Sequence, residues 1–130
     1  MELSEFHVFN MTHYPAAWCC REDVYPGYGP RWQEEIEAML SLQQPFYMVF
    51  IPGDFTEEPA DTRLRAIWLK ANKVRLGEFC KCIISIEPDV ELREHMMAKM
   101  DGLEKAFGVP RRVTASLEEA SALGDSLVGH

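Results

Sequence analysis

The sequence lacks an excess of positive charge, and this absence excludes several classes of function. It contains 13 Lys and Arg residues against 21 Asp and Glu residues, which gives a formal net charge of -8. Broad binding to nucleic acids or anionic membranes needs a positive field, so we expect no nucleic-acid partner. No apolar run approaches the roughly 20 residues of a membrane helix, so we expect no membrane insertion. The acidic segment 1–5 also differs from the basic start of a signal peptide, which favours a cytoplasmic location.

The sequence also lacks the ligand spacings of metal and redox sites. Its 4 cysteines stand as Cys19-Cys20 and as Cys80 and Cys82, and neither spacing is the C-x-x-C of zinc or redox sites. The 4 histidines show no metal-ligand spacing either. We therefore expect no metal, no cofactor and buried thiols, with Cys80 and Cys82 packed on the same face of one strand.

No catalytic motif is present. Serine and cysteine nucleophiles lack a paired base in their sequence context. The nearest approach to an acid/base pair is the set Asp54, Glu57 and Glu58, which stands in an acidic turn where nothing separates the pKa values of the carboxyls. We expect no catalytic residue and a non-enzymatic function, while a closed pocket with buried carboxylates near Asp54 would favour an enzyme.

What the sequence does contain is a central apolar stretch around which the rest is organised. Residues 46–51 form a continuous apolar run of strand length, which is typical of a strand covered on both faces in a parallel sheet. A turn rich in Pro, Gly and acidic residues follows, and a helix is predicted over 62–76. The length of 130 residues suits one domain spanning 1–130.

The remaining segments alternate between strand and helix patterns. Strands are predicted over 6–11, 16–21, 79–86 and 111–115, and helices over 30–43, 88–107 and 116–128. The first two strands form an antiparallel pair across the turn 13–15. The order β-β-α-β-α-β-α-β-α indicates an α/β fold with a mixed, mostly parallel sheet of about five strands and about four helices.

The predicted helix over 62–76 has an unusual composition. Its predicted inward face holds Leu64, Ile67, Trp68, Ala71 and Val74. Its other face carries five basic residues and no acidic one. A basic helix face is most often simply solvated, which is the structural alternative. Two leucines among charges of one sign also suit a protein-binding surface, for an acidic partner or a homodimer. The candidate partner-binding residues are Arg65, Leu69, Lys73 and Leu76.

A second candidate site lies earlier in the chain. Tyr25, Tyr28 and Trp32 surround two glycines and could form the wall of a pocket for a small apolar ligand. Aromatic residues of this kind also serve core packing and loop stacking, which is the structural alternative.

Three segments carry a resemblance to a known family. They are the N-terminal strand pair that leads into an amphipathic helix, the central segments 47–51 and 60–64, and the closing segment 113–120. Their arrangement resembles the STAS fold, and specifically the SpoIIAA-like family of small bacterial proteins. The likeness spans nearly the whole chain and implies a regulatory domain that acts by binding another protein. Lipid-carrier-like relatives in the family imply ligand binding as the alternative.

The resemblance also implies a modification site. In anti-sigma-factor antagonists of the STAS group, an Asp-Ser pair opens the helix behind the central strand, and the serine is phosphorylated. Asp61-Thr62 falls at that place, which makes Thr62 a possible phospho-acceptor because a helix N-terminus favours a phosphate. The alternative is that Asp61 or Thr62 serves only as the helix cap.

Overall fold

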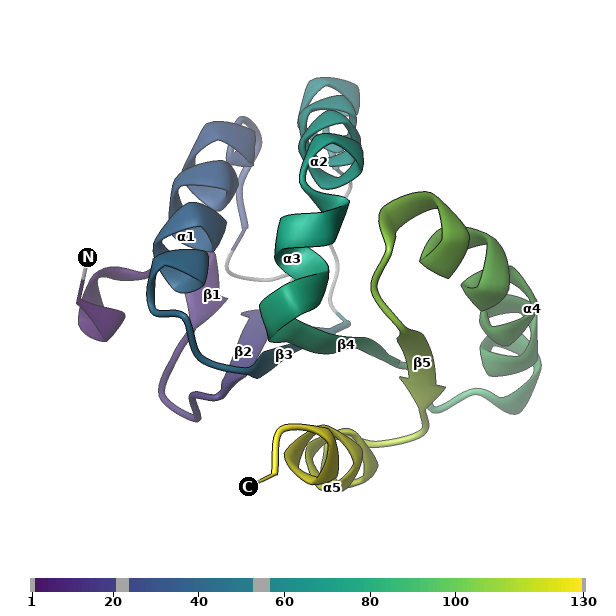
Figure 1. Cartoon of the computed structure of the whole chain (residues 1–130). Helices are drawn as coiled ribbons and strands as arrows, with labels where there is room; N and C mark the ends of the chain where they lie inside the picture. The colour runs from purple at the N-terminus through teal and green to yellow at the C-terminus, as the bar shows by residue number, and fades with distance from the viewer. Residues whose placement is uncertain (1, 21–23, 53–56, 130) are drawn as a thin grey trace.

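The computed structural model describes residues 2–20, 24–52 and 57–129, and its centre is a five-stranded sheet with the strand order β1-β2-β3-β4-β5 (Figure 1). The strands are β1 (Phe9–Asn10), β2 (Ala16–Cys20), β3 (Phe46–Ile51), β4 (Cys80–Ile86) and β5 (Arg111–Thr114). β1 is antiparallel to β2, and all other neighbours are parallel. The predicted mixed, mostly parallel sheet is therefore confirmed, with β3 at its centre.

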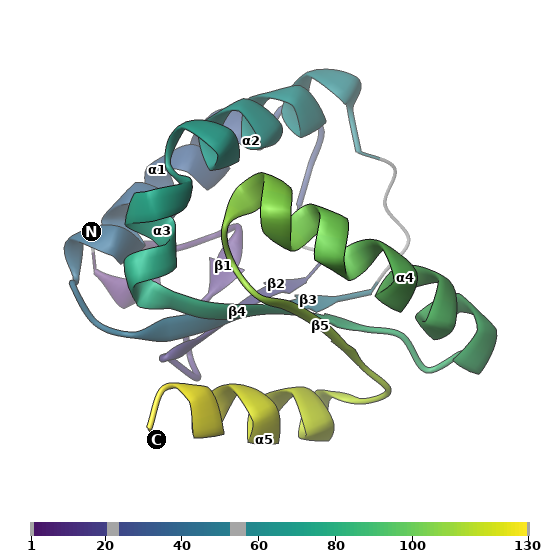
Figure 2. The same ribbon diagram turned by 45° about the vertical axis from the view of Figure 1, so that its right-hand side comes forward.

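Helices cover both faces of this sheet. They are α1 (Gly29–Ser41), α2 (Pro59–Ala71), α3 (Lys73–Phe79), α4 (Val90–Phe107) and α5 (Leu117–Leu127), preceded by the short 3-10 helix η1 (Leu3–Glu5). Figure 2 shows α1 to α4 on one face of the sheet and α5 alone on the other. Among the described residues, no helix combines the length and the apolar character that crossing a membrane requires.

The continuous apolar run of β3 is explained by its two covered faces. Phe46 and Met48 belong to the core beneath α1 to α3, while Tyr47 and Val49 belong to the core beneath α5. Alternate residues of a strand point to opposite sides, so a strand buried on both sides needs apolar residues at every position.

A β-bulge in β4 overturns the prediction that Cys80 and Cys82 share one face. Phe46 pairs with Cys80 and Met48 pairs with Ile83, so the three residues 46–48 of β3 lie opposite the four residues 80–83 of β4. The extra residue shifts the alternation, and the two thiols lie in the two different cores. Both are buried as predicted, and burial raises the pKa of the Cys80 thiol to about 12.

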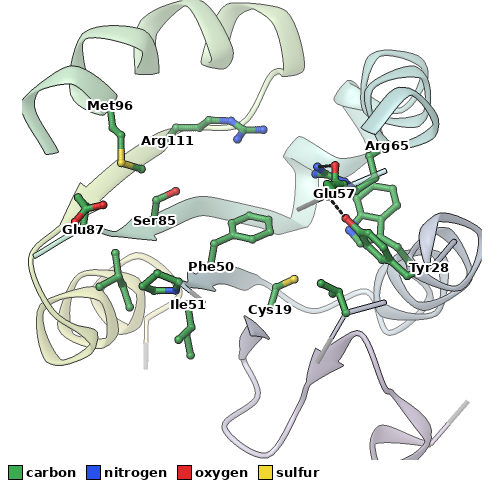
Figure 3. A pocket seen from close by; sticks show the side chains of 14 residues that line it. Cys19, Tyr28, Phe50, Ile51, Glu57, Arg65, Ser85, Glu87, Met96 and Arg111 are labelled. Carbon is green, nitrogen blue, oxygen red and sulfur yellow. Dashed lines mark hydrogen bonds and ion pairs between the residues drawn. The ribbon is translucent and has the colours of Figure 1, made fainter. Parts of the chain in front are cut away.

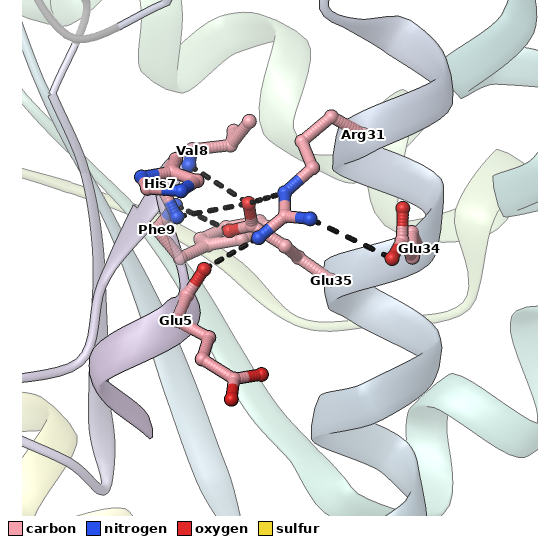
Figure 4. Close-up of polar contacts among 7 residues, drawn as sticks. All are labelled: Glu5, His7, Val8, Phe9, Arg31, Glu34 and Glu35. Atoms are coloured by element: carbon pink, nitrogen blue, oxygen red, sulfur yellow. Dashed lines mark hydrogen bonds and ion pairs between the residues drawn. The ribbon is translucent and has the colours of Figure 1, made fainter. Parts of the chain in front are cut away.

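The N-terminal strand is much shorter than the predicted 6–11, because a buried glutamate takes its hydrogen bonds. The carboxylate of Glu35 in α1 accepts three consecutive backbone N–H groups at 2.9, 3.1 and 2.9 Å: His7, Val8 and Phe9 (Figure 4). Arg31 Nε also donates to it at 2.7 Å. These bonds replace the ladder that the longer strand would need, and they fix the N-terminal segment against α1.

The segment 62–76 is two helices rather than one, and its inward face is only partly the predicted one, because Leu64 and Trp68 pack against the core as expected but Ile67 and Val74 do not. α2 begins at Pro59, and the chain breaks at Asn72 before α3. Leu69 and Leu76 are only 7% and 0% exposed, whereas Ile67 and Val74 are 63% and 75% exposed. The predicted outward position of the two leucines is therefore wrong, and they are core residues that cannot contact a partner.

The orientation of α2 is set by its packing against α1. The Trp68 ring lies edge-on to the Trp32 ring, with centroids 5.4 Å apart, and Trp68 Nε1 donates to Glu37 Oε1 at 3.0 Å. This contact places the next residue, Leu69, toward the core. The break at Asn72 then changes the phase for α3, so that Leu76 also points inward.

Candidate functional site

A cavity of about 310 Å³ lies on the sheet face that α1 to α4 cover (Figure 3). Its floor includes Cys19, Phe50 and Ser85, which are register partners on the adjacent strands β2, β3 and β4. Register partners in neighbouring parallel strands project to the same face, so these side chains form one continuous row. The row lies toward the carboxyl ends of the strands, where open α/β folds place their sites.

The walls of the cavity come from helices and from the loop before α1. Tyr28 and Trp32 line one side, and Met96 of α4 lines another. Tyr28 and Trp32 of the predicted pocket wall line this cavity and are both buried, and their role in ligand binding stays a prediction. Tyr25, the third predicted residue, is not among those that line this cavity and is 48% exposed.

Asp61, in the first turn of α2, connects this helix to the loop before α1. Its buried carboxylate accepts the backbone N–H of Gly27 at 2.8 Å and of Gly29 at 3.0 Å. Gly27 adopts a φ of 87°, a conformation that favours glycine. Asp61 therefore caps the loop before α1 rather than its own helix, which corrects the predicted helix cap. The bond between the starts of α1 and α2 places Tyr28 beside Arg65.

Glu57 lies inside the cavity wall, not in an open turn as the sequence suggested. Thr62 Oγ1 and an Arg65 guanidinium nitrogen each lie 2.5 Å from Glu57 Oε1, and the Tyr28 hydroxyl donates to Oε2. Burial raises the pKa of the Glu57 carboxyl, but these hydrogen bonds outweigh burial and hold the pKa below its ordinary value. Glu57 is thus a stable, ionised anchor for three side chains.

Asp54 and Glu58, the other two carboxylates of the possible acid/base pair, form no site with Glu57 in the described part of the structure. Glu58 is exposed, and Asp54 lies outside the described residues. Burial, followed by the hydrogen bond to Glu57, raises the pKa of Tyr28 well above its usual range, so the phenol stays protonated. The described residues therefore offer no pair of carboxyls with separated pKa values at this site.

Arg111, the first residue of β5, is the functional candidate that sequence reasoning missed. Its guanidinium points into the cavity toward Arg65 (Figure 3). Burial lowers the pKa of Arg111, and within the described ranges no carboxylate forms an ion pair with it. A signal was present in the sequence: Arg111 and Arg112 are consecutive on a strand, so one of the two must face inward.

The predicted phospho-acceptor Thr62 is exposed at the start of α2. Its backbone N–H donates to Glu58 O at 3.1 Å, and its hydroxyl is directed at Glu57. Asp61, predicted to act with it, is buried against the glycine loop. The backbone donor that would attract a phosphate is therefore already used within the helix, and modification of Thr62 stays a prediction.

The remaining candidates and the comparisons add no further site. Within the described ranges, no group of three or more His, Cys, Asp or Glu side chains could hold a metal ion. The chain matches no protein-family model, and no curated protein or solved structure is significantly similar to it. The functional interpretation therefore depends on the geometry of the cavity.

Proposed function

We propose that this chain is a non-enzymatic, SpoIIAA-like domain that binds or senses a small ligand in the cavity between the central sheet and α4. The observation that carries the proposal is the cavity itself, whose lining combines apolar side chains such as Phe50 and Met96 with a few polar groups. This composition is typical of ligand pockets, whose volumes run from roughly 300 to 1,000 Å³. At about 310 Å³, the cavity suits a compact ligand.

The state of Glu57 favours binding over acid–base catalysis. A general acid at neutral pH needs a raised pKa, whereas the pKa of Glu57 is lowered by its hydrogen bonds. A general base needs a lone pair directed at the substrate, but Glu57 already accepts from Arg65, Thr62 and Tyr28. These contacts suit a residue that shapes a pocket.

The first test blocks the cavity with a bulky side chain. Met96 lines the cavity, whereas its neighbour Met97 on α4 is exposed. We expect native mass spectrometry of gently purified wild-type protein to show a bound small molecule. Met96→Trp should remove that mass because the indole fills the cavity, and Met97→Trp should retain it. A ligand-free wild-type mass, or equal retention by both variants, would contradict the proposal.

A second candidate function, association with a protein, is favoured by a different surface from the predicted one. Ile67, Ala71 and Val74, expected to face inward, are exposed on α2 and α3. Exposed basic residues, including Arg63 and Lys70, lie on the same helix. An apolar stripe beside positive charge suits the acidic surface of a second copy of this chain, whose net charge is -8.

This association has its own test. We expect Ile67→Asp combined with Val74→Asp to abolish dimer formation, measured by light scattering after size exclusion, because two carboxylates would be desolvated in the interface. The melting temperature should stay within a few degrees, since both side chains are exposed. Leu127→Asp on α5 is the matched control, because Leu127 is exposed on the opposite face of the sheet. A monomeric wild type, or a dimer that survives the double change, rules this surface out.

A further inference from the structure

The cavity contains more hydrogen-bond donors than the described protein groups satisfy. Arg65 and Arg111 both line it, and the Nε atom of each is buried without a hydrogen-bond partner in the described part of the chain. Trp32 Nε1, on the wall, is buried and unpartnered in the same way. A buried donor without an acceptor is destabilising, so three such groups around one cavity indicate a ligand that supplies acceptors.

The charges at this end of the cavity are also unbalanced. Glu57 is ion-paired to Arg65 at 2.5 Å, and the positive charge of Arg65 contributes to lowering the pKa of Arg111. Glu87 also lines the cavity, but Figure 3 shows the Arg111 guanidinium directed away from it and toward Arg65. Among the described residues, Glu57 pairs with Arg65 and no carboxylate pairs with Arg111, so the described groups at this end of the cavity carry an excess positive charge.

Arg112, the next residue of β5, differs from Arg111 because it has an acidic partner. Arg112 is exposed, and its guanidinium lies 3.6 Å from Glu104. Arg111 instead lies near the Phe107 ring, with its guanidinium carbon 5.4 Å from the ring centroid. Keeping a cation in this position without an acidic partner in the described residues is unfavourable unless an anion joins it.

We propose that the ligand is a small organic oxyanion, a carboxylate or a phosphate monoester with an apolar body. Its oxygens accept from the guanidinium groups of Arg65 and Arg111, which line the cavity, and its apolar body lies along Phe50 and Met96. Guanidinium groups suit this role because their planar N–H donors match the geometry of oxyanions. The inference rests on the proposed function and adds the chemical class of the ligand.

The test compares matched acids and amides. Phenylacetate, phenyl phosphate and the neutral phenylacetamide are titrated into the wild-type protein labelled with ¹⁵N, and the arginine Nε–Hε signals are followed by NMR. We expect at least one acid to bind about tenfold or more tightly than the amide, because the charged oxygens make stronger hydrogen bonds. The Nε–Hε signals of Arg65 and Arg111 should shift on binding. The tighter acid identifies the head group as carboxylate or phosphate.

Two variants of neighbouring arginines on β5 test whether the acid binds at Arg111. Arg111→Leu should weaken binding of the preferred acid by about tenfold or more, because it removes one charged donor. Arg112→Leu changes a neighbouring arginine on the other side of β5 and should leave the affinity within about twofold. Inorganic phosphate alone should bind more weakly than phenyl phosphate, since it lacks the apolar body.

The outcomes separate the inference from the proposed function. If phenylacetamide binds as tightly as the acids and Arg111→Leu has no effect on affinity, the cavity is a ligand site but not an anion site, and the inference is overturned alone. If neither acids nor amide shift the signals of cavity residues, both fail. If the acids bind but Arg112→Leu weakens them as much as Arg111→Leu does, general surface charge explains the binding and the inference is again overturned.

Discussion

Replacing Glu35 by alanine is expected to lower the free energy of unfolding by about 3–5 kcal/mol, the cost of breaking a buried charged pair and orphaning its partners. Glu35 is fully buried and accepts the backbone N–H groups of three consecutive residues, His7 to Phe9. Alanine offers no acceptor, and the short strand β1 cannot supply one. Urea denaturation followed by circular dichroism measures the change.

The matched control for this prediction is the neighbouring glutamate. Glu34 is exposed and lies 3.5 Å from Arg31, so Glu34→Ala should cost less than about 1 kcal/mol, as is usual for surface ion pairs. Hydrogen exchange locates the effect, because the amides of Val8 and Phe9 should lose protection in Glu35→Ala only. Equal free energies of unfolding for the two variants would show that the carboxylate does not hold the N-terminal segment.

The second large effect is expected at Gly124 in α5. A Cβ atom there would lie 2.2 Å from Cε2 of the Tyr47 ring, which is buried and held by a hydrogen bond from its hydroxyl to Asp125 Oδ1 at 2.8 Å. Gly124→Ala should therefore destabilise the protein by about 2 kcal/mol, because the cost of overpacking exceeds the gain in helix propensity.

The same substitution at Gly102 of α4 should have the opposite sign. A Cβ atom at Gly102 meets nothing within 4 Å, so Gly102→Ala should stabilise the protein by up to about 1 kcal/mol through helix propensity alone. Thermal melts of the two variants provide the comparison. A melting temperature that rises in both would mean that α5 moves away from Tyr47 without cost.

Much of the fold could be predicted because, in several segments, the apolar pattern is compatible with only one choice of buried face. The run 46–51 indicates a strand buried on both sides, and it is the central strand β3. The stripe of Trp32, Ile36, Met39 and Leu40 in α1 is buried as one face. The other face of α1 is largely polar and β3 has no polar face at all, so in both segments local sequence and tertiary packing favour the same arrangement.

The helix pair α2–α3 shows where this logic fails. Apolar residues occur on both sides, so two inward faces were compatible with helical spacing, one through Ile67 and Val74 and one through Leu69 and Leu76. The choice depends on the contact between Trp68 and Trp32 and on the break at Asn72, and neither follows from periodicity. Leu69 and Leu76 were assigned to the outer face for this reason.

The aromatic side of the site was predicted from the sequence, whereas its cationic side was not. Tyr28 and Trp32 stand beside glycines in a pattern that suggests a pocket wall, and both line the cavity. Arg65 and Arg111 are 46 positions apart, from 65 to 111, and their shared end of the cavity exists only because the sheet brings β5 back toward α2. An unpartnered Nε atom is a property of three-dimensional packing, so no sequence pattern could reveal it.

The two ends of the cavity differ in how tightly they are hydrogen-bonded and packed, and this difference has a consequence for selectivity. The Asp61 carboxylate ties the glycine loop to α2, so Tyr28 and Arg65 are held in place before any ligand arrives. By contrast, α4 has no buried residue along its length, and it contributes the adaptable thioether of Met96. We expect strict discrimination between head groups and broad tolerance of the size and shape of the tail.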